Sequence, residues 1–449
     1  MLRVKGAVQH YDWGRIGEDS GVARLYAVSS GNAIDEGKPY AELWMGTHPS
    51  GPSLLFVDES SPEHGILLNE WLQKNPDALG EAVLKKWHGE LPFLFKVLSV
   101  AKALSIQAHP DKNLAEKLFQ TQPKVYKDAN HKPEMALALT EFEALCGFMG
   151  PQELKQVLES VSELRNVLNE MDVTQMLNVS ENPSEGLPSE SQAALKRAFT
   201  TVMTLDKQTA AESVRTLTAR LTKEKVSRKL SAREELLLVL GKQYPDDVGV
   251  LASLFLNHIV LKPGEAVYLA ANVPHAYISG ECVECMATSD NVVRAGLTPK
   301  FRDTATLSSM LTYEQGMPDL LDGYEVSLFT RRYSPPFEEF EVDLITVPGG
   351  DSLDFAAISG PSIFLVSDGK GTVVFSQGGR PSVVKKGDIF FMPAGKEFHI
   401  SAKAGVEVNG HVNGHANGNG HGVGNGNGST AMPPNAIRLY RAGVNSNFL

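Results

Sequence analysis

Three separate parts of the chain carry polar side chains of the types that bind metal ions. Gln107 and His109 are two residues apart, so on a β-strand both side chains would face the same side. Glu134 ends the segment His-Lys-Pro-Glu, in which the proline fixes the local backbone. His275 follows an apolar run and a Val-Pro pair. Two imidazoles and two oxygen donors suit zinc, so these four residues together predict a metal site.

Each of these segments also has a plainer explanation. A Gln-x-His pair is typical of a strand with two half-buried polar groups, and residues 131–134 are typical of a surface turn. His275 is equally consistent with a structural histidine whose hydrogen bonds are satisfied inside the protein. The occurrence of all three segments in one chain is what favours a metal site.

A later loop has the composition of an anion site. Arg294 and Lys300 lie six residues apart, and Gly296 and Pro299 shape the loop between them. A guanidinium and an ammonium on a short rigid loop suit an anionic group. A solvated loop with ordinary surface cations is the alternative.

Cys282 and Cys285 form a C-x-x-C pair, a pattern found in redox and zinc sites. The third cysteine, Cys146, stands alone, so a second pair of zinc ligands is missing and no disulfide framework is possible. We interpret the cysteines as packing residues on a buried strand. Glu284 lies between them and would point to the opposite side from its two neighbours.

The elements that must position these residues change along the chain. Residues 1–110 combine short β-like runs with proline and glycine turns. Residues 151–244 carry apolar side chains at helical spacing, and strand patterns return from about residue 248. The clearest β-like runs lie at residues 93–100, 104–109 and 435–441.

A weak internal repeat occurs in the β-rich part. Residues 264–275 and 387–399 each run from a Gly-acid pair through an apolar strand and a turn to a histidine. The pattern resembles the second half of the cupin signature, although Ala270 stands where proline is usual and the second copy has one extra residue. We therefore predict a mainly β fold with a helical insert: two cupin-like (jelly-roll) β domains plus an α-helical domain.

The predicted domain boundaries follow these changes in pattern. Residues 1–150 and 248–320 would form the zinc-containing catalytic cupin-like domain, and residues 151–247 the helical domain. Residues 321–449 would form the C-terminal cupin-like domain. Within it, residues 409–428 are Asn/Gly/His low complexity with too few apolar residues to order themselves, which predicts a disordered loop with incidental histidines.

Composition excludes several classes of function. The formal net charge of −11 argues against a nucleic-acid surface. No apolar run approaches the roughly 20 residues that span a bilayer, and the N-terminal residues lack the apolar core of a signal peptide. We expect a cytoplasmic protein with neither a nucleic-acid nor a membrane partner.

Five segments make the chain similar to a known family. They are Tyr-Asp-Trp-Gly at 11–14, Leu-Pro-Phe-Leu-Phe-Lys at 91–96, Gln-Ala-His-Pro-Asp-Lys at 107–112, Asp-Ala-Asn-His-Lys-Pro-Glu-Met at 128–135 and Ser-Asp-Asn-Val-Val-Arg-Ala-Gly-Leu-Thr-Pro-Lys at 289–300. These long motifs resemble the hallmark segments of type I mannose-6-phosphate isomerases, and the resemblance extends to about residue 400. The Asn/Gly/His tract departs from the family pattern.

The resemblance implies a site and an activity. One zinc ion would be bound by Gln107, His109, Glu134 and His275, with Arg294 as a catalytic residue. The residues in or around the pocket would be Trp13, Lys96, Ser105, Lys132, Tyr277, Glu284, Asp290 and Lys300. The family implies a monomer that takes a small sugar phosphate, interconverts mannose 6-phosphate and fructose 6-phosphate, and feeds GDP-mannose synthesis.

Such an aldose–ketose isomerase must move a proton between C1 and C2 and stabilise the enediol between them. We expect Arg294 to stabilise the enediolate, and Lys300, with Ser105 and Lys96, to hold the phosphate. Glu284, Lys132 and His275 are the candidate bases. Two rival functions are a non-catalytic cupin sugar-binding protein and a metal-dependent cupin oxygenase. An oxygenase iron site prefers two histidines and one carboxylate, so Gln107 argues against it.

Overall fold

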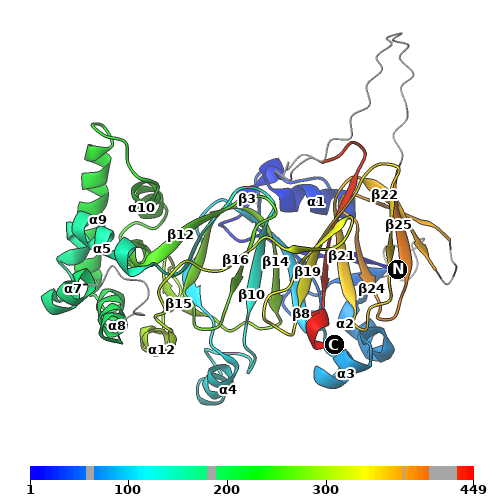
Figure 1. Cartoon of the computed structure of the whole chain (residues 1–449), viewed down its shortest axis with the longest axis horizontal. Coiled ribbons are helices and arrows are strands. Elements are labelled where there is room, and N and C mark those ends of the chain that lie inside the picture. The colour runs from blue at the N-terminus through cyan, green and yellow to red at the C-terminus, as the bar shows by residue number, and fades with distance from the viewer. Residues whose placement is uncertain (57–64, 179–188, 377, 379, 404–431) are drawn as a thin grey trace, which may run out of the picture.

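The computed structural model describes residues 1–56, 65–178, 189–376, 378, 380–403 and 432–449. The predicted Asn/Gly/His loop at 409–428 lies outside these residues. Figure 1 shows three blocks along the long axis: a group of helices at one end, a β-rich block in the middle, and a second β-rich block that carries both termini.

The middle block is an 11-stranded antiparallel sheet whose main path runs β16-β13-β10-β14-β8-β5-β2. The long strand β14 pairs with β8, β9, β10 and β11, so it connects most of the sheet. The strands are β2 (Ala7–Gln9), β5 (Glu42–Met45), β8 (Phe93–Val100), β9 (Ile106–Ala108), β10 (Glu134–Ala138), β11 (Phe142–Phe148), β12 (Leu256–Leu261), β13 (Ala266–Leu269), β14 (His275–Ala287), β15 (Val293–Gly296) and β16 (Leu320–Leu321).

The second β block pairs a nine-stranded sheet with a four-stranded sheet. The larger sheet contains β17 (Tyr324–Ser327), β18 (Thr330–Tyr333), β19 (Glu341–Val347), β26 (Ile437–Gly443), β21 (Ser362–Asp368), β24 (Ile389–Met392), β1 (Leu2–Lys5), β6 (Leu54–Phe56) and β7 (Ile66–Leu67), in this order. The smaller contains β20 (Ser352–Phe355), β25 (Phe398–Ala402), β22 (Lys370–Phe375) and β23 (Ser382–Lys385). A separate two-stranded ribbon joins β3 (Arg15–Ile16) to β4 (Pro39–Tyr40).

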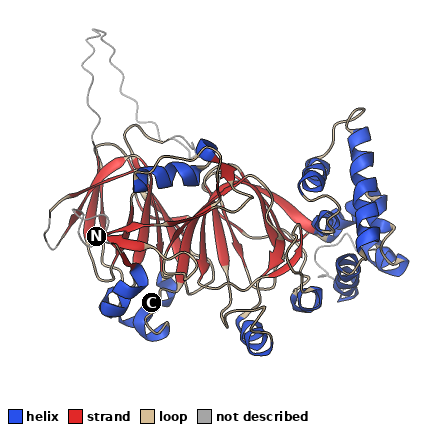
Figure 2. Cartoon of the chain, turned by 180° about the vertical axis from the view of Figure 1, so that it is seen from behind, coloured by secondary structure: helices blue, strands red, loops and turns tan. Residues whose placement is uncertain are grey.

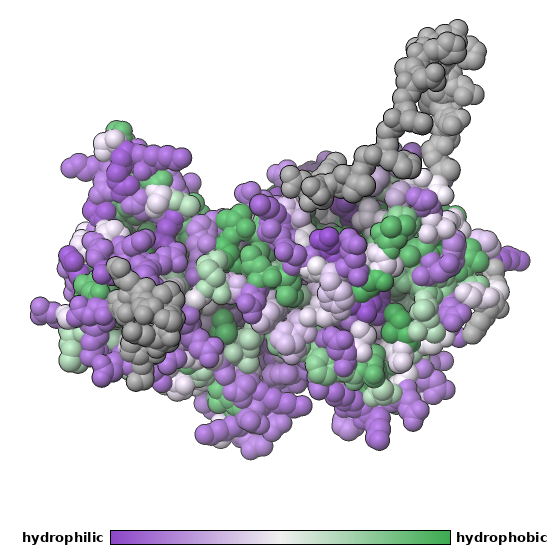
Figure 3. Space-filling view, in the orientation of Figure 1, coloured by the Kyte–Doolittle hydropathy of each residue, from purple (hydrophilic) through white to green (hydrophobic). Residues whose placement is uncertain are grey.

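The helical block occupies the opposite end of the molecule from this second β block (Figure 2). Its helices are α5 (Pro151–Ser160), α6 (Ser162–Arg165), α7 (Glu170–Leu177), α8 (Ser189–Met203), α9 (Lys207–Glu224), α10 (Ala232–Gln243) and α11 (Gly249–Ala252). The remaining α-helices of the described chain are α1 (Gly21–Ser30), α2 (Leu68–Lys74), α3 (Glu81–Lys86), α4 (Lys112–Thr121) and α12 (Thr304–Met310). In Figure 3, hydrophilic residues make up most of the coloured part of the helical block on the face shown.

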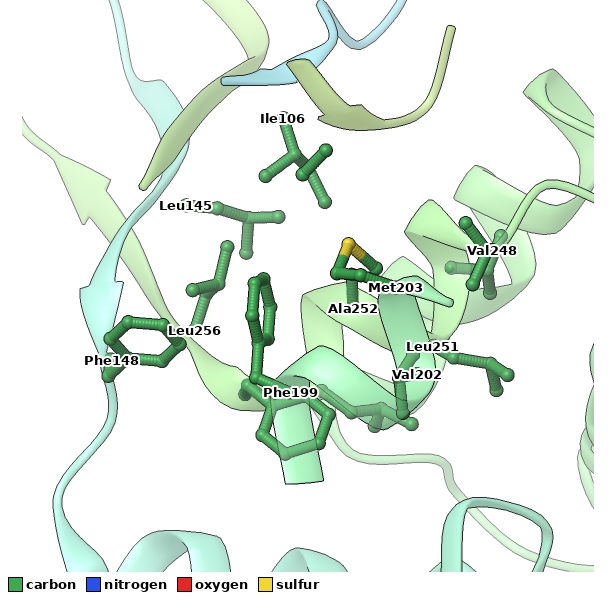
Figure 4. Packing of buried hydrophobic residues seen from close by; sticks show 14 of the residues in the cluster. Ile106, Leu145, Phe148, Phe199, Val202, Met203, Val248, Leu251, Ala252 and Leu256 are labelled. Atoms are coloured by element: carbon green, nitrogen blue, oxygen red, sulfur yellow. The ribbon is translucent and has the colours of Figure 1, made fainter. Parts of the chain in front are cut away.

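The helices begin where the sequence supplies N-caps. Asp206 accepts backbone hydrogen bonds at the start of α9, and Ser231 with Glu234 forms a capping box at the start of α10. One apolar cluster joins this block to the middle sheet, because Phe199 and Met203 of α8 pack toward Leu145 of β11 (Figure 4). Burial of this shared face fixes the helices against the sheet.

The predicted fold class is confirmed: a β-rich protein with a helical insertion. The strands predicted at 93–100, 104–109 and 435–441 appear as β8, β9 and β26, with the last two shifted at their ends. One feature was not predicted. β1, β6 and β7 come from the first 67 residues but pair within the sheet of the C-terminal block, so this sheet takes strands from both sides of the expected boundary at residue 321. Local strand patterns do not encode which distant strand is the partner.

The three cysteines are free and buried, and Cys282 and Cys285 pack in different apolar clusters on the two sides of β14. This agrees with their interpretation as packing residues. Within the described residues, no helix is both long enough and apolar enough to span a bilayer.

Candidate functional site

Two histidines and one carboxylate meet where three strands of the middle sheet lie side by side. His109 follows β9, Glu134 opens β10 and His275 opens β14. The Nε2 atoms of His109 and His275 lie 3.3 Å and 3.4 Å from the same Glu134 Oε2. All three side chains are buried, and their ligand atoms lie within 4.8 Å of one another. The structure therefore brings three of the four predicted metal ligands together in one cluster that could hold a metal ion.

The backbone presents both imidazoles in the form that binds a metal. His109 Nδ1 lies 2.6 Å from the carbonyl oxygen of Asn291, and His275 Nδ1 lies 3.0 Å from that of Val273. A carbonyl only accepts, so each Nδ1 carries the hydrogen and each Nε2 presents a lone pair. Both Nε2 atoms are buried without a hydrogen-bond partner among the described residues. Burial lowers the pKa of His109 to about 4, which keeps its ring neutral near pH 7.

Gln107 lies beside this cluster. It pairs in register with His275 on one side of β9 and with Arg294 on the other. Its Oε1 accepts a hydrogen bond of 3.3 Å from the Ser105 hydroxyl, and the residue lines the same cavity as Glu134. Two buried lone pairs, a carboxylate and a nearby amide form a donor set that fits a zinc-sized cation.

A cavity of about 330 Å³ opens over the cluster. It brings together residues that are far apart in the sequence, because the middle sheet and the loops after β14 and β15 all reach it. Among its lining residues are Trp13, Lys96, Ser105, Gln107, Lys132, Glu134, Tyr277, Glu284, Asp290, Arg294 and Lys300.

A network of buried charges forms one wall of the cavity. The Lys96 ammonium lies 2.9 Å from Glu284 Oε2 and 3.4 Å from Glu42 Oε2, and stands over the Trp44 ring at 5.1 Å from its centroid. The Trp44 indole donates a hydrogen bond to Glu42. Burial disfavours the charged form of Lys96, but Glu284 and Glu42 outweigh this and raise its pKa. Burial raises the pKa of Glu284 against the opposing effect of Lys96.

Arg294 is the cation best placed to receive an anion. Its side chain is partly buried in the cavity, and burial lowers its pKa. Within the described part of the chain, its guanidinium makes neither a hydrogen bond nor an ion pair. Lys132, in contrast, lies 3.3 Å from Glu134 Oε1, whereas Lys300 is exposed at the cavity's edge. A half-buried guanidinium without a competing carboxylate partner suits the stabilisation of negative charge on a ligand.

Comparison with known proteins decides the family. Residues 1–150 match the model of the type I phosphomannose isomerase catalytic domain, and residues 167–256 match that of its helical insertion domain. Mannose-6-phosphate isomerase 1 of Arabidopsis thaliana is 45% identical over 449 residues, covering 100% of this chain and 95% of the relative. The chain belongs to the type I phosphomannose isomerase family.

More distant members of the type I phosphomannose isomerase family agree. Mannose-6-phosphate isomerase of Homo sapiens is 42% identical over 86% of this chain and 92% of its own length. A variant of phosphomannose isomerase from Salmonella typhimurium has a TM-score of 0.78 at 27% identity, covering 99% of each chain. A mannose 6-phosphate isomerase bound with zinc and yttrium has a TM-score of 0.76 at 28% identity, with the same coverage. The predicted resemblance is thus confirmed, and the chain is an isomerase.

The sequence did not indicate every residue that shapes the site. Glu42 and His48 line the cavity, and His48 Nε2 lies 3.4 Å from Asp290 Oδ1, which lowers the pKa of Asp290. Asn291 supplies the carbonyl that orients His109, and its side-chain amide is anchored on Asp128. The sequence positions of Glu42, His48 and Asn291 show no spacing that is typical of metal ligands. Their roles depend on contacts between distant strands and loops, which a local pattern cannot reveal.

Proposed function

We propose that this chain interconverts D-mannose 6-phosphate and D-fructose 6-phosphate through an enediol intermediate, with one zinc ion bound by Gln107, His109, Glu134 and His275. The observation that carries the proposal is the pair of buried Nε2 atoms that face one carboxylate beneath a cavity lined in part by Arg294, Lys132 and Lys300. Zinc would supply positive charge next to the sugar oxygens during reaction.

The cavity walls suit the proton transfer that the reaction needs. Glu284 is the proposed base, because burial raises its pKa toward the working pH and its carboxylate lines the cavity. Lys132, 3.3 Å from Glu134, is the second proposed catalytic residue, placed to donate hydrogen bonds beside the metal ligands. Trp13, Tyr277 and Asp290 line the space around them and would shape it to the sugar.

Charge placement suits the rest of the substrate. The Arg294 guanidinium has no hydrogen-bond or ion-pair partner within the described chain and would stabilise the enediolate. Lys300 and Ser105 lie at the cavity's edge and would bind the phosphate. Lys96 is paired with two carboxylates, so we assign it to holding Glu284 in place beneath the substrate rather than to binding the phosphate.

The proposal extends to the role in the cell. Mannose 6-phosphate formed here would feed GDP-mannose synthesis, and the cytoplasmic location and the monomeric state remain predictions. Isomerisation of a sugar phosphate between its aldose and ketose forms requires no redox partner. An oxygenase, in contrast, must consume oxygen, so the two functions can be told apart.

The decisive experiment is an assay of the full chain with mannose 6-phosphate before chelation, after chelation and after zinc is restored. We expect fructose 6-phosphate to form, to stop with chelator and to return with zinc. In deuterated water, deuterium should enter at C1 of the fructose 6-phosphate formed, and at C2 of any mannose 6-phosphate re-formed from it. No turnover in a folded, zinc-loaded protein would leave a sugar-binding role, whereas iron with oxygen uptake would indicate the oxygenase.

A further inference from the structure

Two loops supply the proposed phosphate end of the cavity. One precedes β9 and carries Ser105, and the other follows β15 and carries Lys300. Both loops run along the side of the middle sheet that faces the helical block, as the shared apolar cluster with Ala103 and Leu297 shows. The distance between the two loops therefore depends on the contacts that each loop makes with the helical block.

Asp247 holds the second loop through its backbone. Its Oδ1 accepts hydrogen bonds from the Leu297 N–H at 2.8 Å and the Gly249 N–H at 2.6 Å, and its Oδ2 accepts one from the Thr298 N–H at 3.1 Å. Bonds to a carboxylate are stronger than those between neutral groups. Asp247 lies between α10 and α11, so the anchor belongs to the helical insertion.

The conformation of this loop needs such an anchor. Leu297 has φ +54°, a left-handed conformation that is unfavourable for a branched side chain. A Cβ on Gly296 would lie 2.4 Å from the Gly249 Cα, so the two backbones pack directly against each other. Asp247 thus fixes a strained turn three residues before Lys300.

The first loop is attached to the same stretch of the insertion. The Ala103 N–H donates a hydrogen bond of 2.9 Å to Gln243 Oε1, and the Tyr244 hydroxyl donates one to the Ala103 carbonyl. Lys102 places its ammonium 4.5 Å from the centroid of the Tyr244 ring. Gln243 and Tyr244 therefore hold the first loop, and Asp247 holds the second.

We propose that Gln243, Tyr244 and Asp247 of the helical insertion position the phosphate-binding groups, with Asp247 as the principal positioning residue. The inference rests on the proposed function, because it takes Ser105 and Lys300 as the phosphate contacts. Asp247 touches neither the metal ligands nor the proposed base in the described structure. Its loss should therefore weaken recognition of the phosphate and leave the chemical step largely unchanged.

The test compares Asp247→Asn with Asp246→Asn in the full-length, zinc-loaded protein. Asparagine keeps the shape but offers one acceptor oxygen where two are needed. Asp246 is a matched control because its carboxylate pairs with Arg215 on the surface. For Asp247→Asn we expect the KM for mannose 6-phosphate and the inhibition constant of inorganic phosphate to rise together by about 10-fold, with kcat within about 2-fold and zinc content unchanged. Asp246→Asn should match the wild type.

Gln243→Leu supplies a second variant that acts on the other loop, in case Asp247→Asn does not fold. It should raise the same inhibition constant by about 3-fold. Unchanged phosphate inhibition in the folded variants, or a fall in kcat and zinc content at constant KM, would overturn the inference. Should the wild type prove inactive as an isomerase, calorimetric binding of inorganic phosphate, weaker in Asp247→Asn, would still support it.

Discussion

The two copies of the internal repeat end in histidines with very different surroundings. His275 is 2% exposed, and its Nε2 faces Glu134 in the group formed by His109, Glu134 and His275. His399, at the corresponding place after β24, is partly exposed and places Nδ1 2.8 Å from Asp354, whose side chain is 92% exposed. A shared strand–turn–histidine pattern therefore specifies a strand and a turn, whereas neighbouring strands decide whether the histidine meets a second imidazole and a carboxylate.

The interiors of the two β blocks differ in the same way. Behind β24 the space is filled by aromatic rings: Phe364 stacks on Phe390 at 4.9 Å and Phe355 on Phe398 at 4.6 Å between centroids. The interior of the middle block instead contains the buried ion pairs of Lys96 with Glu42 and Glu284, and an open cavity. One interior is packed for stability, and the other leaves polar groups available to a ligand.

The sharpest contrast should come from the repeat histidines. We expect His275→Ala to lose zinc and to lower kcat/KM by about 10³-fold or more, because the cluster loses one of its two imidazoles. Metal analysis and the isomerase assay measure both effects. Retained zinc and near-normal activity would remove His275 from the proposed ligand set.

A buried ion cluster in the C-terminal block should affect stability without affecting catalysis. Arg441 is fully buried, with hydrogen bonds to Glu341, Asp343 and Ser362. Arg441→Met leaves two buried carboxylates with less compensation, so we expect a loss of about 3–5 kcal/mol in unfolding free energy. Zinc content and KM of the folded fraction should not change.

A surface lysine provides the matched control for that measurement. Lys386 lies 4.0 Å from Asp368, and both side chains are about half exposed. Lys386→Met should shift stability by less than about 0.5 kcal/mol. Equal effects of the two substitutions in denaturant melts would contradict the role given to the buried cluster.

The buried ion cluster around Arg441 also predicts that the stability of the protein depends on pH in the acidic range. Burial raises the pKa of Asp343, but the charges and hydrogen bonds of Arg441 and Arg332 outweigh burial and hold the pKa below its usual range. A lowered native pKa contributes stability above the unfolded pKa near 4, and this is lost as pH falls through the lower native value. Melts of chelator-treated protein should show that the unfolding free energy of the wild type falls more than that of Asp343→Asn as the pH drops from 5 to 3. Parallel curves would mean that Asp343 is not responsible.

The smallest effect should belong to the second histidine. His399→Ala removes a contact with a solvent-exposed carboxylate, so stability should change by less than about 0.5 kcal/mol, with activity and zinc content unchanged. Loss of zinc from this variant would show that the two repeats are functionally closer than their surroundings indicate.

Several strands and three residues of the candidate site could be predicted from the sequence, each for its own physical reason. β8 is a mostly apolar run and β26 carries apolar residues interrupted by two arginines, and these local patterns were sufficient to predict both strands. His109, Glu134 and His275 could be grouped because histidines and carboxylates have recognisable chemistry. Their closeness in space is a fact of the structure.

Other features depend on pairing between distant segments. Glu42 joins Lys96 only because β5 pairs with β8, and Asp247 reaches Leu297 only because the insertion folds back on the sheet. Neither carboxylate has a characteristic spacing. The placement of β1 beside β24 is of the same kind, since strand register is set by the whole sheet.

β1 also connects the first residues of the chain to some of the last, with Leu2 opposite Phe391 and Val4 opposite Ile389. A ribosome adding 5–20 residues per second needs about 20–80 s to make this partner after β1 emerges. The sheet around the metal cluster has all its strands once β16 is complete, while the other sheet still has an open edge. Nascent chains therefore pass through a stage in which the middle sheet has all its strands, whereas β1, paired with β6 on one side, still exposes the edge that later meets β24.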